Sequence, residues 1–338
     1  MATAPALAER LDGVPIVNRV EIEQLAPGTE HRFWLEAGST PLGQPYLVPV
    51  MVMRGAEDGP RLWLSAAVHG DELNGVRVVQ RLFDDLDPLA LRGTVIGLPA
   101  VNLPGIAAHS RFFPLAEDGG SQVDLNRVWP GEAGSADAAR RFAHDLWTGV
   151  AERRIDLAID LHTQTRGAVF PLFVFADFRN PHAERLARAL GPDMIKVDQG
   201  AAGSLETAFI EAGVPAVTLE IGGPKRFDEP LIRRALDGLR ALMVGEGMLD
   251  EPVAERPPPF VGQEEATVRA VSGGFVEVLV ELGDDVIAGQ PIARQVDLFG
   301  NPIARYTAPF DGRVLSIATD PLREPGAMLV RLLRALQG

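Results

Sequence analysis

Residues 61–75, Arg-Leu-Trp-Leu-Ser-Ala-Ala-Val-His-Gly-Asp-Glu-Leu-Asn-Gly, decide the fold. Residues 61–68 form a short apolar run that is typical of a buried strand, and His69 follows it directly. From residue 72 to residue 86, apolar side chains recur with helical spacing. The stretch therefore predicts a strand, a polar turn at His69-Gly70-Asp71-Glu72 and a helix.

The same alternation of strands and helices continues on both sides of this unit. Further strands are expected at 29–35, 46–53, 94–99, 155–161, 173–176 and 214–221. Further helices are expected at 136–150, 181–190, 204–212 and 229–243. Strands that alternate with helices indicate an α/β domain with a parallel or mixed sheet and flanking helices, which we assign to residues 1–255.

The three prolines at 257–259 end this pattern, because a proline run continues neither a helix nor a central strand. Beyond them, short strands are expected between glycine turns, at 268–271, 275–279, 291–295, 303–308 and 313–317. We therefore expect a small all-β, barrel-like domain over residues 256–338.

The composition excludes several classes of function. The chain has 338 residues, with 32 Lys+Arg against 46 Asp+Glu, which gives a net charge of −14. Such a surface repels nucleic acid and anionic membranes. No apolar run reaches the roughly 18 residues of a membrane helix, and no signal peptide is visible, so a cytoplasmic location is expected. Cysteine is absent, so a metal must be held by His, Asp or Glu.

Two of the six histidines follow predicted strands. His69 lies three residues before Glu72, and His162 ends the Asp160-Leu161-His162 sequence. The carboxyl ends of strands are where sites are built in α/β sheets. Two imidazoles and one carboxylate make the protein ligand set of a catalytic zinc, although each motif taken alone is also typical of ordinary turns.

Two further features carry polar side chains that a site could use. Asp124-Leu125-Asn126-Arg127 could clamp a carboxylate through the Arg fork and the Asn amide, or could form a surface turn. Glu220 lies in an apolar strand and is costly to bury, so it faces either a cleft or solvent at a sheet edge.

In their order along the chain and in their residues, these motifs resemble those of the succinylglutamate desuccinylase/aspartoacylase family over about residues 45–245. That family belongs to the wider zinc carboxypeptidase-like group, so the resemblance implies its mixed sheet with flanking helices. It also implies one Zn²⁺ per chain, held by His69, Glu72 and His162. Asn126 and Arg127 match the pair that binds the substrate carboxylate.

The resemblance assigns three more roles. Asp124 matches the carboxylate that supports the first histidine ligand, Glu220 matches the general base toward a zinc-bound water, and Arg111 matches the arginine that polarises the scissile carbonyl. The implied activity is a zinc-dependent hydrolase that cleaves the amide bond of a small anionic N-acylated amino acid. Two alternatives stay open: a metallocarboxypeptidase acting on a peptide C-terminus, and a non-catalytic binding protein.

The C-terminal region resembles a biotinyl/lipoyl-type domain at residues 283–292 and 308–314. Such a carrier needs an acceptor lysine, and the chain's two lysines are Lys196 and Lys225, so a carrier role is excluded chemically. The remaining expectations for this domain are that it caps the active site or makes subunit contacts in a homo-oligomer.

Overall fold

The computed structural model describes residues 10–113, 122–151 and 154–336. Within these residues, no helix is both long enough and apolar enough to cross a lipid bilayer. The strands of the N-terminal three quarters of the chain are β1 (Arg10–Leu11), β2 (Val14–Val17), β3 (Thr29–Ala37), β4 (Tyr46–Arg54), β5 (Glu57–Ala66), β6 (Arg92–Leu98), β7 (Leu157–His162), β8 (Ala168–Val169), β9 (Leu172–Ala176), β10 (Met194–Val197) and β11 (Ala216–Ile221). The α-helices are α1 (Asn74–Asp85), α2 (Leu103–Ala107), α3 (Ala138–Leu146), α4 (Pro181–Ala189), α5 (Leu205–Glu211) and α6 (Glu229–Gly245). The C-terminal strands are β12 (Phe260–Arg269), β13 (Gly274–Val278), β14 (Asp285–Val286), β15 (Pro291–Val296), β16 (Pro302–Thr307), β17 (Gly312–Ala318), β18 (Leu322–Arg323) and β19 (Met328–Ala335).

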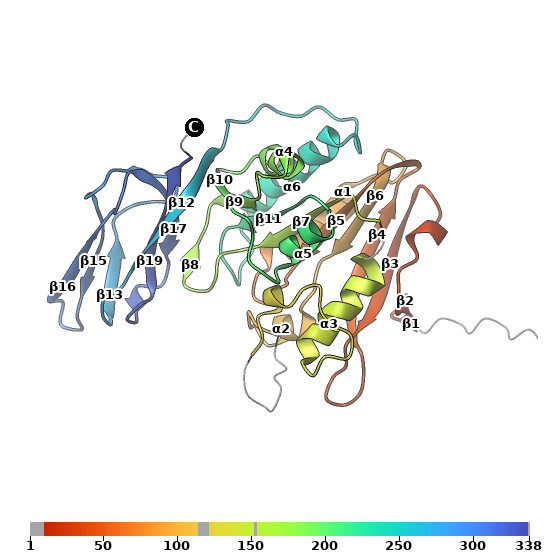
Figure 1. The fold of residues 1–338 in the computed structure, drawn as a ribbon, viewed down its shortest axis with the longest axis horizontal. Helices are drawn as coiled ribbons and strands as arrows, with labels where there is room; N and C mark the ends of the chain where they lie inside the picture. The colour runs from red at the N-terminus through yellow and green to blue at the C-terminus, as the bar shows by residue number, and fades with distance from the viewer. Residues whose placement is uncertain (1–9, 114–121, 152–153, 337–338) are drawn as a thin grey trace, which may run out of the picture.

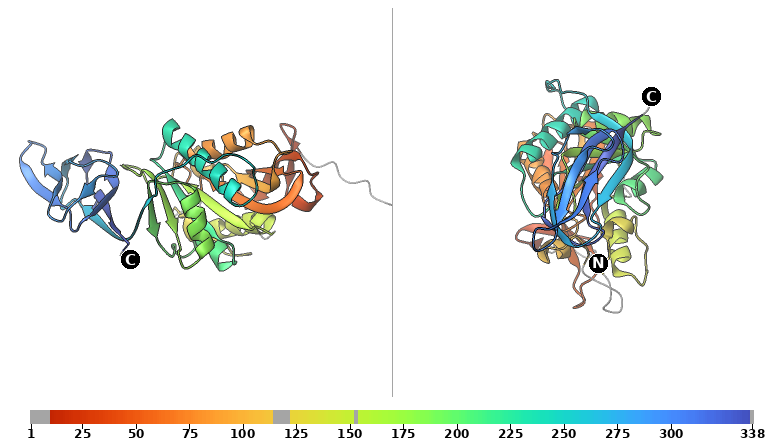
Figure 2. Two further views of the ribbon diagram at one scale, coloured as in Figure 1. Left: turned by 90° about the horizontal axis from the view of Figure 1, so that it is seen from above. Right: turned by 90° about the vertical axis from the view of Figure 1, so that its left-hand side faces the viewer.

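The sheet is mixed, as the sequence predicts, and the helices lie on both of its faces (Figure 2). Strand side chains alternate between the two faces. On β5, Leu62 and Leu64 pack with α1, α4 and α6 in one core, whereas Trp63 packs with α3 and α5 in the other. The expected α/β class with flanking helices is therefore confirmed.

Most predicted elements differ from the structure by a few residues at their ends, and two helices show this most clearly. Helix α1 begins at Asn74, so Glu72 lies in the turn before it and donates its backbone N–H to the carbonyl of His69 at 3.1 Å. The helix expected at 136–150 is instead α3 followed by a short π-helix, Trp147–Ala151. The first difference affects the site, because it frees the Glu72 side chain to turn toward the end of the strand.

Three neighbouring parallel strands, β5, β7 and β11, position the polar residues. Ser65 of β5 lies opposite Asp160 of β7, and Glu220 of β11 lies opposite His162. Because parallel strands end at the same edge of a sheet, the residues that follow β5 and those that end β7 and β11 gather there.

The sheet continues past the proline linker into the C-terminal strands (Figure 1). Strand β12 pairs in parallel with β10, and β17 pairs with β8. A second, antiparallel sheet follows the order β16-β15-β13-β18, so the expected small all-β unit is present in the fold. The sequence pattern does not predict β10, β19, most of β12 or the short strands β1, β2, β8, β14 and β18. The boundary at 255/256 stays a prediction.

Candidate metal centre and active site

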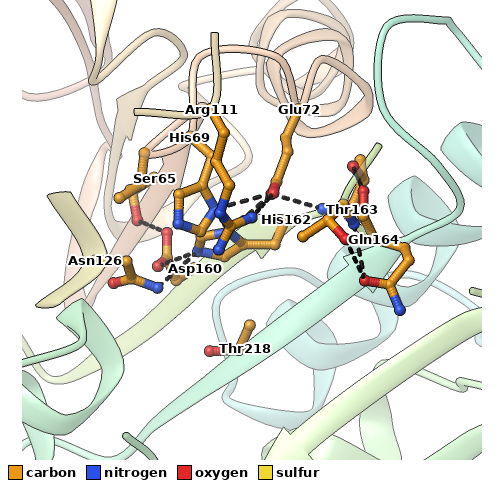
Figure 3. Close-up of polar contacts among 12 residues, drawn as sticks. Ser65, His69, Glu72, Arg111, Asn126, Asp160, His162, Thr163, Gln164 and Thr218 are labelled. Carbon is orange, nitrogen blue, oxygen red and sulfur yellow. Dashed lines mark hydrogen bonds and ion pairs between the residues drawn. The ribbon is translucent and has the colours of Figure 1, made fainter. Parts of the chain in front are cut away.

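His69, Glu72 and His162 converge on one point at the carboxyl edge of the sheet (Figure 3). Their potential ligand atoms all lie within 4.8 Å of one another, and all three residues are buried. Nδ1 of His69 is 2.9 Å from Oε1 of Glu72, and Nδ1 of His162 is 2.9 Å from Oε2 of the same carboxylate. The three side chains therefore face one another through the atoms that would bind a metal.

The outer nitrogen of each imidazole contacts a carboxylate. Nε2 of His69 is 3.1 Å from Oδ1 of Asp124, and Nε2 of His162 is 2.7 Å from Oδ2 of Asp160. Ser65 in turn donates its hydroxyl to Oδ1 of Asp160 at 2.7 Å. Metal-binding histidines commonly make such a contact, which fixes the ring and its tautomer and leaves the other nitrogen free for the metal. Asp160 lies within the Asp160-Leu161-His162 motif, and its sequence context predicts no role for it.

The electrostatics of the cluster favour the ionised form of its carboxylate. Burial by itself raises the pKa of Glu72, but the imidazoles of His69 and His162 outweigh it and hold this pKa well below its usual range. Burial lowers the pKa of His162, but Asp160 and Glu72 outweigh that effect and raise it well above its usual value. Two imidazole nitrogens and a carboxylate form a donor set that suits zinc, so the residues present fit this metal.

Two glycines allow the close packing that brings the cluster together. A Cβ atom on Gly70 would lie 2.1 Å from the backbone carbon of Gly105, and one on Gly75 would lie 2.7 Å from Cβ of Leu161. The first contact holds the turn that carries His69 and Glu72 against α2, and the second seats α1 on β7. Their function is packing, which agrees with the absence of a phosphate-loop motif.

The three other predicted polar residues border the same cluster. Arg111 donates from Nη1 to Oε1 of Glu72 at 2.7 Å. Nδ2 of Asn126 is 3.4 Å from Nε2 of His162, and its Oδ1 accepts the backbone N–H of Leu205 at 2.8 Å. The guanidinium of Arg127 donates to the backbone carbonyl of Asn126 at 2.6 Å.

Glu220 faces a cavity of about 340 Å³ that these residues line. It is 8% exposed, and its Oε2 has no hydrogen-bond partner among the residues that the structure describes. Burial raises its pKa to about 8, which the nearby His162 opposes and the charge of Glu72 reinforces. A buried, unpartnered carboxyl beside a metal-type cluster is the arrangement expected of a proton-transfer group.

The family comparison decides the relationship of this chain. The model of the succinylglutamate desuccinylase/aspartoacylase catalytic domain matches residues 58–245, which is more than half of the 338 residues. The chain belongs to the succinylglutamate desuccinylase/aspartoacylase family. The resemblance drawn from the motifs is thereby confirmed.

Curated relatives within the desuccinylase/aspartoacylase family are named as deacylases. The N-alpha-acetyl-L-2,4-diaminobutyric acid deacetylase of Halomonas elongata is 30% identical over 280 residues, which cover 79% of each chain. The succinylglutamate desuccinylase of Ectopseudomonas mendocina is 27% identical over 250 residues, which cover 68% of each chain. Both names describe hydrolytic removal of an acyl group.

Solved structures share the fold over nearly the whole chain. The product-bound ectoine utilization protein EutE of Ruegeria pomeroyi superposes with a TM-score of 0.80 at 24% identity, covering 92% of this chain and 97% of that one. A family member from Rhodobacter sphaeroides gives a TM-score of 0.80 at 22% identity, with coverages of 91% and 96%. At these identities the likeness shows the fold, which extends into the C-terminal strands.

The structure adds cavity residues that the sequence analysis missed. Glu206 and Thr218 line the cavity from α5 and β11, and Arg331 reaches it from β19 in the C-terminal region. Residues 163–165, 200 and 201 also contribute to the lining.

Proposed function

We propose that this protein is a zinc-dependent amidohydrolase that removes the acyl group from an N-acylated amino acid. The observation that carries the proposal is the buried convergence of His69, Glu72 and His162 beside the unpartnered carboxyl of Glu220. The deacetylase and desuccinylase relatives support the reaction class, since both act on the non-peptide amide of an acylated amino acid.

The metal site would consist of His69, Glu72 and His162, with Asp124 and Asp160 holding the two imidazoles. When bound there, Zn²⁺ supplies a Lewis acid that polarises an amide carbonyl and lowers the pKa of water. A further contact braces the carboxylate of Glu72, since its Oε2 accepts the backbone N–H of Thr163 at 2.9 Å. Each of the three proposed metal ligands is thereby held in place by a neighbouring residue of the chain.

Glu220 would move the proton. Its unpartnered Oε2 takes a proton from the attacking water, holds it, and delivers it to the nitrogen of the leaving amine. A pKa raised to about 8 by burial suits both transfers near neutral pH. Water addition to the amide carbon followed by cleavage of the C–N bond gives a carboxylate and a free amine.

The arginines and Asn126 would orient the substrate. Arg127 binds its carboxylate through the guanidinium fork, and the Nδ2 of Asn126 adds a neutral donor. Arg111 lies at the edge of the cluster and would donate to the developing oxyanion. These positive groups make the cavity receptive to an anionic substrate even though the protein as a whole carries a charge of −14.

The test measures amine release from a panel of N-acyl amino acids by the zinc-loaded protein. Glu220→Gln should lower kcat by about 10³-fold while the zinc content stays unchanged, because the amide keeps the shape but not the proton transfer. Glu211→Gln, at the exposed end of α5, is the matched control and should keep full activity.

Two results would point to the alternatives. Release of C-terminal residues from peptides, without cleavage of N-acyl amino acids, would favour a metallocarboxypeptidase. Equal rates for the zinc-loaded wild type and Glu220→Gln on every compound would favour a non-catalytic binding protein and would contradict the proposal.

A further inference from the structure

The proposed mechanism leaves one buried acid in the cavity without a task. Glu206 lies on α5, is 4% exposed and lines the cavity. Its Oε2 accepts the hydroxyl of Thr218 at 2.6 Å, but its Oε1 has no hydrogen-bond partner among the described residues. Burying a carboxyl oxygen without a partner is costly, so a ligand group that satisfies it would be favoured.

The position of Glu206 relative to the proposed chemistry follows from strand β11. Thr218 and Glu220 are two residues apart on this strand, so their side chains share a face and their Cα atoms lie roughly 7 Å apart. Figure 3 shows Thr218 set apart from the cluster of His69, Glu72 and His162. The carboxyl of Glu206, held by Thr218, therefore lies about two strand residues from the proposed proton-transfer group.

Two other carboxylates act on the charge of Glu206. Burial raises its pKa to about 8, and the charges of Asp160 and Asp198 add to that rise, against the hydrogen bond from Thr218. Asp198 also lines the cavity and forms an ion pair with Lys196 at 2.9 Å. The cationic residues Arg111 and Arg127 line the same cavity, so a ligand bound there can contact both acidic and basic side chains.

We infer that Glu206 binds an ammonium group on the side chain of the amino acid, so that the preferred substrates are N-acylated diamino acids. This inference rests on the proposed function. The substrate carboxylate would lie on Arg127, and the ammonium would reach Oε1 of Glu206. Four single bonds from the scissile nitrogen span roughly 5 Å, which fits the spacing along β11. Arg331 also borders the cavity. Its Nε is 3.4 Å from Oε1 of Glu265.

The experiment compares two substrates that differ only in the ammonium group. Nα-acetyl-2,4-diaminobutyrate carries it, and Nα-acetyl-2-aminobutyrate has the same carbon chain without it. The zinc-loaded wild type should prefer the first by about 10- to 100-fold in kcat/KM, as expected for a charge-assisted hydrogen bond. Glu206→Gln should bring this ratio close to one and leave kcat/KM for the second compound within about threefold.

Two variants control for folding and for charge on the same helix. Glu206→Asp keeps a carboxyl group and should retain part of the preference, and Glu211→Gln should retain all of it. Zinc content and thermal unfolding are measured for each variant. If Glu206→Gln does not fold, the wild-type ratio and the Glu206→Asp ratio decide the question.

The outcomes separate this inference from the proposed function. Equal wild-type kcat/KM for the two compounds, or equal losses on both in Glu206→Gln, would overturn the inference and leave the deacylase proposal standing. Hydrolysis of no N-acyl amino acid by the zinc-loaded protein would overturn the deacylase proposal, and this inference with it.

Discussion

Two regions of the large sheet, its centre and its C-terminal part, differ in how acidic side chains are partnered. In the region of β5, β7 and β11, the carboxyls of Glu206 and Glu220 each keep an oxygen without a hydrogen-bond partner among the described residues. At the seam, where the C-terminal strands β12 and β17 pair with β10 and β8, Glu265 forms ion pairs with Lys196 at 3.2 Å and with Arg331 at 3.4 Å. These pairs balance charge, although they lack the alignment of hydrogen bonds. The acids that form no ion pair lie where we expect a ligand, and the acid that forms two ion pairs lies where the strands join.

The seam also reaches the cavity wall. Gln164 donates its side-chain amide to the hydroxyl of Ser316 at 3.0 Å, and that hydroxyl donates to the carbonyl of Val169 at 2.9 Å. Gln164 directly follows Thr163, whose backbone N–H contacts Glu72. The proposed chemistry therefore lies in the first region, and the C-terminal strands support one wall of the cavity.

The largest expected effect is on metal binding. His162→Ala should reduce the zinc content from about one ion per chain to near zero and lower activity by about 10³-fold or more, because the cluster loses one of three ligands. Arg331→Met, on the C-terminal side, should keep its zinc. Elemental analysis of both purified variants checks this, and zinc loss in Arg331→Met would erase the distinction between the regions.

The next effect is the dependence of stability on pH. The folded-state pKa of Glu206 is raised to about 8, above the ordinary value of 4.5, so the folded state binds the extra proton between these values. Stability contributed by this group is then lost as pH rises from about 4.5 to about 8, by up to about 1.4 kcal/mol per pH unit. Glu206→Gln removes the titration.

Urea unfolding at pH 5 and at pH 7.5 measures this difference between Glu206→Gln and the wild type. The variant should gain stability relative to the wild type as the pH rises. Glu211→Gln, which is exposed on the same helix, should follow the wild type at both values. A constant difference between Glu206→Gln and wild type would mean that Glu206 does not titrate in this range.

The residues of the site also differ in how far the sequence predicts them. The metal-type cluster comes from short motifs at strand ends, where the polar residues and the apolar runs before them are adjacent in the chain. The contacts of Glu206 and Arg331 join segments that are distant in the chain, and α5 and β19 carry no motif that marks them. Strand β12 mixes polar and charged residues with apolar ones and has no continuous apolar run, so its pattern is weaker than that of a buried central strand.

A smaller effect is expected at Arg331, which lines the cavity from the C-terminal strands. Arg331→Met should raise KM for an anionic N-acyl amino acid by about tenfold and change kcat less than threefold, because a positive charge beside the substrate is lost without any change at the metal. Arg334→Met is the matched control on the same strand, where the arginine pairs with the exposed Glu264. A fall in kcat alone would instead place Arg331 in the chemical step.

The smallest expected effect concerns the link between the seam and the wall. Ser316→Ala leaves the amide of Gln164 and the carbonyl of Val169 without this hydroxyl, at a cost of about 1–3 kcal/mol in the free energy of unfolding. Because Thr163 and Glu72 keep their own hydrogen bond, kcat should fall less than threefold. Ser272→Ala, whose hydroxyl donates to the adjacent Gly273, is the control. A loss of kcat as large as that of Glu220→Gln would mean that the C-terminal strands position the catalytic groups themselves.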